Sequence, residues 1–221
     1  MEEINKIDSI AQENSKLAVQ EKELAKQSKQ VAEFELKRAK ARETLAEKEY
    51  DLTKIKREWA EKKLNLYIQK NDIRKKGLIE FTDSDLKTEE EVAIYNQKVS
   101  EIQEQIAELY TEIAAVEKKI AKAMLALSKD KVYAAEQREK LAKKQSDYVK
   151  FVKGNQPETK ISNAKNQIED QQKELVKARN YIVEKEKEIQ GLQNELANHK
   201  KMLSTKLSIR EKIRHSGVPS D

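Results

Sequence analysis

The sequence contains no cysteine, and its 221 residues include only 4 glycines, 2 prolines and 5% aromatic residues. Without cysteine the chain forms no disulfide and has no thiolate nucleophile or thiolate metal ligand, and its redox compartment stays open. The glycines are isolated, at positions 77, 154, 191 and 217, so no glycine-rich loop can bind phosphate. Few turn formers and few large apolar residues exclude a thick globular core and predict long helices.

Charged residues make up 38% of the chain, with 45 Lys and Arg against 40 Asp and Glu. The positive surplus is spread along the chain, and many Lys and Glu stand four residues apart, where they pair along a helix. Nucleic acid is therefore not a favoured partner. No run approaches the roughly 18 apolar residues of a membrane span. Localisation is left open: cytoplasmic if Met1 is the native start, periplasmic or secreted if a leader has been removed.

The sequence offers no catalytic, cofactor-binding or metal-binding constellation. Its only histidines, His199 and His215, do not form the paired spacing of a zinc site. Asp83 and Asp85 resemble the opening of a calcium loop, but the glycine and the distal glutamate of such a loop are missing. We therefore expect no enzyme activity, no cofactor and no metal.

A seven-residue repeat fills most of the chain. Nine repeats from Ile10 to Asp72 open on a large residue that is usually followed by Ala, as in LAVQEKE. The large residues are Ile10, Leu17, Leu24, Val31, Leu45, Leu52, Trp59 and Leu66, with Arg38 as the one break. The phrase returns nine times from Val92 to Gly154, where a second apolar stripe makes a full seam as far as Leu127. A looser run starts at Ile161.

Two breaks, around Gly77 and at Gly154–Pro157, set the boundaries. Thr88 and Glu91 have the spacing of a capping box, and Leu78, Ile79, Phe81 and Leu86 are expected to fold over the end of the bundle. The predicted segments are a helix over 1–76, an acidic connection over 77–91, a helix over 92–153, a turn or hinge over 154–158, a helix over 159–215 and a flexible tail over 216–221, all in one elongated domain.

The fold class predicted is all-α: an elongated antiparallel coiled-coil hairpin plus a third long helix. Equal lengths of the first two runs favour antiparallel packing, with the second helix in the middle. The three helices form a rod, or a bent or V shape if the break at Gly154–Pro157 opens. Stripe residues, Trp59 among them, are expected in the core.

We expect a non-enzymatic structural or scaffolding coiled-coil protein that associates with itself or with a larger body such as a filament, sheath or secretion apparatus. One alternative is a membrane-surface remodelling helical hairpin, which the basic clusters of the sequence would support. Another alternative is a holdase-like chaperone or adaptor. Protein partners are favoured over a membrane surface. Arg38, which interrupts the stripe, is the candidate determinant of register or partner choice. The candidate protein-contact surface consists of Phe34, Leu36, Tyr50, Leu64 and Tyr67.

Overall fold

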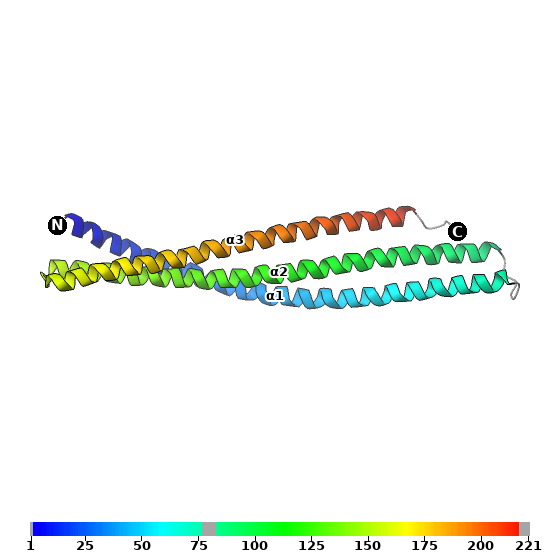
Figure 1. Ribbon diagram of the computed structural model, residues 1–221, viewed down its shortest axis with the longest axis horizontal. Coiled ribbons are helices and arrows are strands. Elements are labelled where there is room, and N and C mark those ends of the chain that lie inside the picture. Colours follow the sequence, from blue (N-terminus) through cyan, green and yellow to red (C-terminus); the bar gives the residue numbers. More distant parts are fainter. Residues whose placement is uncertain (1, 77–82, 217–221) are drawn as a thin grey trace. The chain divides into compact units, whose positions relative to one another are not determined.

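The computed structural model describes residues 2–76 and 83–216. This part of the chain forms three long helices and no strand (Figure 1). They are α1 (Glu2–Lys75), α2 (Asp83–Lys153) and α3 (Glu158–Ser216). Helix α1 packs on α2, and α2 packs on α3. The predicted all-α class with three long helices is confirmed.

Helix α2 begins at Asp83, nine residues before the predicted start at 92. The segment 83–91 therefore belongs to the helix, and Thr88 lies inside it and is not the N-cap. Aspartate and serine favour the first turn of a helix, so Asp83, Ser84 and Asp85 suit this earlier start. Leu78, Ile79 and Phe81 lie outside the described residues, as do the side chain of Leu86 and the tail from 217.

The chain divides into two compact units, each with a part of all three helices. Unit 1 comprises Met1–Arg38 and Lys119–Gln193, and unit 2 comprises Ala39–Lys118 and Asn194–Asp221. Contacts between side chains far apart in sequence define the packing within each unit.

In unit 1, α1 and α2 run antiparallel. Lys153 Nζ lies 2.9 Å from Asp8 Oδ2, and Lys22 Nζ lies 3.0 Å from Glu139 Oε2. A step of fourteen residues forward along α1 thus matches a step of fourteen backward along α2. The two helices keep a constant register over this stretch.

The same antiparallel register holds within unit 2. Arg57 Nε of α1 lies 2.5 Å from Glu104 Oε2 of α2, and Asn71 Nδ2 donates to Glu90 Oε2 at 3.2 Å. Again fourteen residues forward match fourteen backward. Residues of α3 complete an apolar cluster with residues of α2. Its buried members are Ile102, Ile106, Leu109, Ile113 and Leu203.

The turn between α2 and α3 lies in unit 1 and is closed by backbone hydrogen bonds. Gln156 N–H donates to the Phe151 carbonyl at 3.0 Å, and Asn155 N–H donates to the Val152 carbonyl at 3.2 Å. Asn155 has a φ of 47°, the left-handed conformation that this C-terminal cap requires. Pro157 then precedes the first turn of α3. Because Gln171 of α3 reaches back to α2, the chain folds back at this break, and no open V is seen in unit 1.

Candidate assembly surface

The α1–α2 contact is built from small residues. In α1, six consecutive alanines at seven-residue spacing are 8% exposed or less; they are Ala11, Ala18, Ala25, Ala32, Ala39 and Ala46. In α2, eight small residues at the same spacing are equally buried; they are Ala93, Ser100, Ala107, Ala114, Ala121, Ser128, Ala135 and Ala142. We call these two sets the small-residue seam. Their short side chains allow the two helices to approach closely.

The large residues of the α1 repeat do not lie in this seam. Six of the eight precede an alanine by one residue, which places them about 100° around the helix from it; Leu52 precedes Thr53 and Leu66 precedes Tyr67. Trp59 is 72% exposed and Val31 is 62% exposed, whereas Ala32 is 3% exposed. The expectation that Trp59 belongs to the core is therefore wrong. The repeat predicted the spacing of the buried positions but not which of the two neighbouring residues is buried.

In unit 2, the large residues of α1 and α2 have different environments. Ile106 and Ile113 of α2 are buried in the cluster that Leu203 of α3 completes. The large residues that open the α1 repeats in the same unit remain more than half exposed. They are Leu45, Leu52, Trp59 and Leu66, which we call the apolar row, and Ile55 beside them is 50% exposed. The row is thus a linear apolar surface that no other described segment of unit 2 covers.

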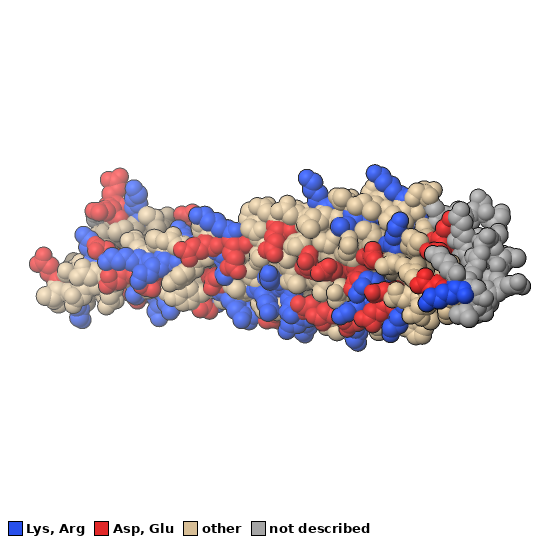
Figure 2. Space-filling model, turned by 45° about the vertical axis from the view of Figure 1, so that its right-hand side comes forward, with Lys and Arg blue, Asp and Glu red and all other residues tan. Residues whose placement is uncertain are grey.

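Charged side chains of both signs border the apolar row. Five exposed lysines follow or precede row residues by three or four positions: Lys48, Lys56, Lys62, Lys63 and Lys70. Exposed carboxylates also stand beside the row, at Glu49, Asp51 and Glu58. Figure 2 shows the same mixture on one face of the protein, with basic and acidic side chains interleaved among other surface residues. The border of the row therefore suits a partner that carries both charges.

The five residues predicted as a contact surface are not equally accessible. Phe34 is 66% exposed, whereas the other four are half-buried. Leu36, Tyr50 and Leu64 each follow a small position of α1 by four residues and flank the seam. Their role as a contact surface stays a prediction.

Arg38 is the first residue of its seven-residue repeat in α1. It is the only charged residue at that position among the nine repeats from Ile10 to Asp72. Its side chain is 55% exposed, and its guanidinium lies 3.7 Å from Glu35 Oε1 on the same helix. Exposed pairs of this kind contribute little to stability. The side chain is therefore accessible to a partner, and its predicted role in register or partner choice remains a prediction.

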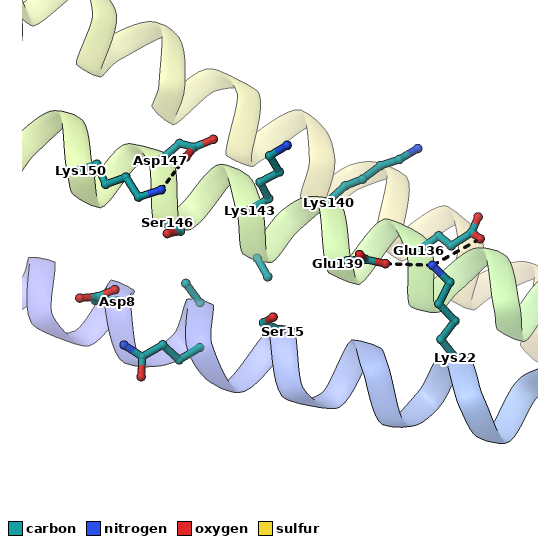
Figure 3. Close-up of a pocket in the computed structure, with 13 residues that line it drawn as sticks. Asp8, Ser15, Lys22, Glu136, Glu139, Lys140, Lys143, Ser146, Asp147 and Lys150 are labelled. Atoms are coloured by element: carbon teal, nitrogen blue, oxygen red, sulfur yellow. Dashed lines mark hydrogen bonds and ion pairs between the residues drawn. The ribbon is translucent and has the colours of Figure 1, made fainter.

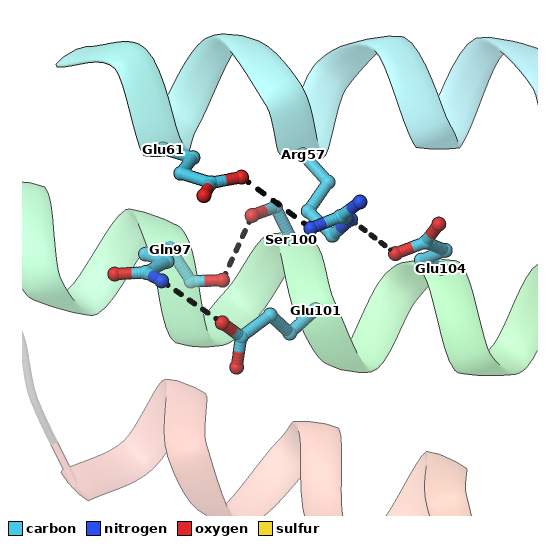
Figure 4. Close-up of polar contacts among 6 residues, drawn as sticks. All are labelled: Arg57, Glu61, Gln97, Ser100, Glu101 and Glu104. Carbon is cyan, nitrogen blue, oxygen red and sulfur yellow. Dashed lines mark hydrogen bonds and ion pairs between the residues drawn. The ribbon is translucent and has the colours of Figure 1, made fainter. Parts of the chain in front are cut away.

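Polar contacts across the seam, which the sequence did not single out, hold the register. Figure 4 shows Arg57 reaching from α1 between Glu104 of α2 and Glu61 of its own helix. In unit 1, Ser28 Oγ lies 3.1 Å from Ser128 Oγ. The Ser128 side chain is 2% exposed, so a shift of one helix along the other would leave its buried hydroxyl without this partner.

A polar groove of about 650 Å³ lies over the seam in unit 1, between α1 and α2 (Figure 3). Lys22 Nζ lies 3.0 Å from Glu139 and 3.8 Å from Glu136. The hydrogen bond to Glu139, aided by both negative charges, raises the pKa of Lys22. Lys150 pairs with a carboxylate of the groove on its own helix, at Asp147. These ion pairs account for the groove as a solvated edge of the helix contact.

One of the two histidines of unit 2, His199, also takes part in helix packing. His199 Nδ1 of α3 lies 3.0 Å from Glu112 of α2, and its Nε2 lies 4.0 Å from Glu195. Within residues 2–76 and 83–216, no three His, Cys, Asp or Glu side chains are grouped so that they could hold a metal ion. No described helix is long and apolar enough to cross a membrane.

Comparison with models of known protein families and with curated proteins gives no match to this sequence.

Proposed function

We propose that the chain is a non-enzymatic structural protein, a coiled-coil scaffold that assembles with itself or with a larger helical body through the apolar row of α1. The observation that carries the proposal is the different exposure of the two repeats in unit 2. Ile106 and Ile113 of α2 are covered by α3, while Trp59 and its neighbours in α1 are open to water. Large apolar residues that remain exposed in line are typical of interaction surfaces.

The energetics of the seam support the same proposal. Alanine buries little apolar area, so the α1–α2 contact gains less from burial than a seam of leucines, at about 25 cal/mol per Å². Ordering each backbone residue costs about 1–2 kcal/mol. Covering Leu45, Leu52 and Trp59 with a further helix would add the apolar burial that the single chain lacks.

The test is the mass of the protein in solution, measured by light scattering from micromolar to millimolar concentration. We expect the mass to rise above the 25.6 kDa of one chain. The double variant Leu52→Gln, Leu66→Gln should remain at the mass of one chain. Ile68→Gln is the matched control, because Ile68 is 44% exposed on the same helix but lies off the row. A single-chain mass at all concentrations would count against self-assembly.

A membrane surface is the second candidate, because lysines border a row that contains tryptophan. Amphipathic helices with basic borders lie in the interface of anionic membranes. Asp51 and Glu58 weigh against this role, since anionic headgroups repel carboxylates. Trp59 is the single tryptophan of the chain and reports directly on its surroundings. A blue shift of its emission with anionic vesicles but not with neutral ones would favour the membrane; the scaffold predicts no shift with either.

A further inference from the structure

We propose that the apolar row pairs with the same row of a second copy, with the two α1 helices parallel and in register over residues 44–70. The inference rests on the proposed self-assembly and names its partner and its orientation. Its basis is the placement of apolar and charged residues around the row in unit 2.

The spacing of the apolar residues favours the parallel orientation. In a parallel pair of helices, each residue of a seven-residue stripe meets its own counterpart. Leu52, Trp59 and Leu66 would then each meet an apolar residue of the second copy. In an antiparallel pair, each row residue of one copy would instead face the residue of the other copy that stands three positions after a row residue. Lysines stand at two such positions, Lys48 and Lys62, so the antiparallel pair would place charges against the row.

The lysines at these two positions still fit a parallel pair. Their counterparts in the second copy are the same lysines, and the positions alternate with Ile55, which meets its own counterpart. Lysine has a long apolar stem that covers neighbouring apolar surface while the ammonium stays in water. Two such layers weaken the contact and leave it reversible, as suits an assembly that forms with concentration.

The charges at the border of the row favour the same orientation. In a parallel pair, the residue before a stripe position faces a residue five positions further along the partner. Asp51 then faces the second copy's Lys56, and Glu58 faces the second copy's Lys63. By symmetry each contact forms twice. The remaining two positions, Thr44 and Asn65, are uncharged. In an antiparallel pair the flank that carries Asp51 and Glu58 meets itself, and its carboxylates repel.

The sequence also limits where the pairing starts. Arg38 stands at the first position of its repeat, so a parallel pair would bring two guanidinium groups together there, as it brings together the ammonium groups of Lys48 and of Lys62. Lys37 would face the second copy's Arg42, a further repulsion between like charges. The contact is thereby confined to the part of α1 that lies in unit 2, which begins at Ala39. In this pairing Arg38 would mark the end of the contact, which is one form of the register or partner role predicted for it.

The second helix does not compete with α2 for α1. The residue after each row position lies about 100° around the helix and is more buried than the row: Ala46 belongs to the small-residue seam, and Thr53, Ala60 and Tyr67 are half-buried. Packed helices stand 8–10 Å apart, roughly, so at this angle both neighbours fit without overlap. The exposed state of Asp51, Lys56, Glu58 and Lys63 leaves these four side chains accessible from outside the unit.

The absence of cysteine makes the orientation directly testable with the full chain. Leu52→Cys and Leu66→Cys, each made alone, are oxidised mildly and run on a non-reducing gel. A parallel pair places both positions against their own counterparts, so each variant should form a disulfide-linked dimer. An antiparallel pair allows this at no more than one of the two positions. Lys54→Cys, exposed but off the row, is the matched control and should form little dimer. Far-ultraviolet circular dichroism checks that each variant keeps its helix content.

Charge reversal supplies an independent measurement that needs no cysteine. Asp51→Lys turns two attractive contacts into repulsive ones, and we expect the dimer dissociation constant to rise about 5- to 30-fold. Adding Lys56→Asp to the same chain restores opposite charges across a parallel pair and should restore the affinity.

The outcomes separate this inference from the proposed function. Cross-linking at both row positions together with charge rescue supports the parallel pair. A dimer that cross-links at one row position, or at neither, overturns the parallel pair but leaves self-assembly standing. A single-chain mass at every concentration overturns both, and a Trp59 shift with anionic vesicles would then favour a membrane surface.

Discussion

In the α1 repeat the small residues are buried and the large residues are exposed, which is the reverse of a usual heptad. The two kinds of position should therefore respond differently to substitution. Val31 and Ala32 are neighbours in unit 1. A heptad with large core residues would bury Val31 and expose Ala32, whereas here Ala32 is buried and Val31 is exposed. We predict that Val31→Ala leaves stability nearly unchanged, whereas Ala32→Leu lowers it clearly.

The magnitudes follow from exposure. Val31 is 62% exposed, so truncation loses little more than a third of the about 1.5–3 kcal/mol for full burial. Removing a β-branched residue from a helix returns a few tenths of a kcal/mol, so the net loss is about half a kcal/mol or less. Ala32 is 3% exposed against α2, and extra carbons there cost about 1–3 kcal/mol by overpacking.

The assay is thermal unfolding followed by circular dichroism at 222 nm, with micromolar protein to suppress association. For a chain of this length, 1 kcal/mol shifts the midpoint by about 2–4 °C. Ala32→Leu should therefore lower the midpoint by about 2–12 °C, while Val31→Ala should shift it by no more than about 2 °C. A larger loss for Val31→Ala than for Ala32→Leu would refute the small-residue seam.

Substitutions at three further sites test the helices and their contacts in the same assay. Gly191→Ala should stabilise α3 by about 1 kcal/mol, because an added Cβ meets nothing within 4 Å; an unchanged midpoint would contradict this. Asn155→Ala should lower stability by about 1 kcal/mol because of the positive φ, whereas Asn155→Gly should not, and equal effects would argue against the cap. Gln171→Ala should cost about 1–3 kcal/mol, because Gln171 Nε2 donates to Gln137 Oε1 at 2.8 Å in a buried contact. Replacing both glutamines with leucine should recover most of that loss, and no recovery would argue against the pair.

Several features of the fold were predictable because they depend on local sequence. Helix formers with few glycines and prolines predict long helices, and the break before Pro157 predicts where α3 starts to within one residue. The start of α2 was not predicted, because Asp83–Asp85 and Thr88–Glu91 both resemble helix N-termini. The structure places the start at the first of the two.

The candidate surface was only partly predictable. Arg38 stood out because it interrupts a regular stripe, and the structure leaves it exposed. Trp59 was assigned to the core because large apolar residues are usually buried. The signal that would have corrected this was present in both repeats. Small residues recur every seven positions in α1 and in α2, and two such helices can pack through those residues and leave the large ones outside.

The sequence by itself determined the three helices, their seven-residue period and the absence of cysteine. A period gives the spacing of the buried positions, but two adjacent residues such as Val31 and Ala32 share the same period. Only the tertiary structure decided between them, because the choice depends on the partner helix. The alanines of α1 pack against the small residues of α2. The large residues of α2, such as Ile106 and Ile113, pack instead in the apolar cluster that includes Leu203 of α3. The large residues of α1 in unit 2 face no such helix within the described chain, and this leaves the apolar row exposed.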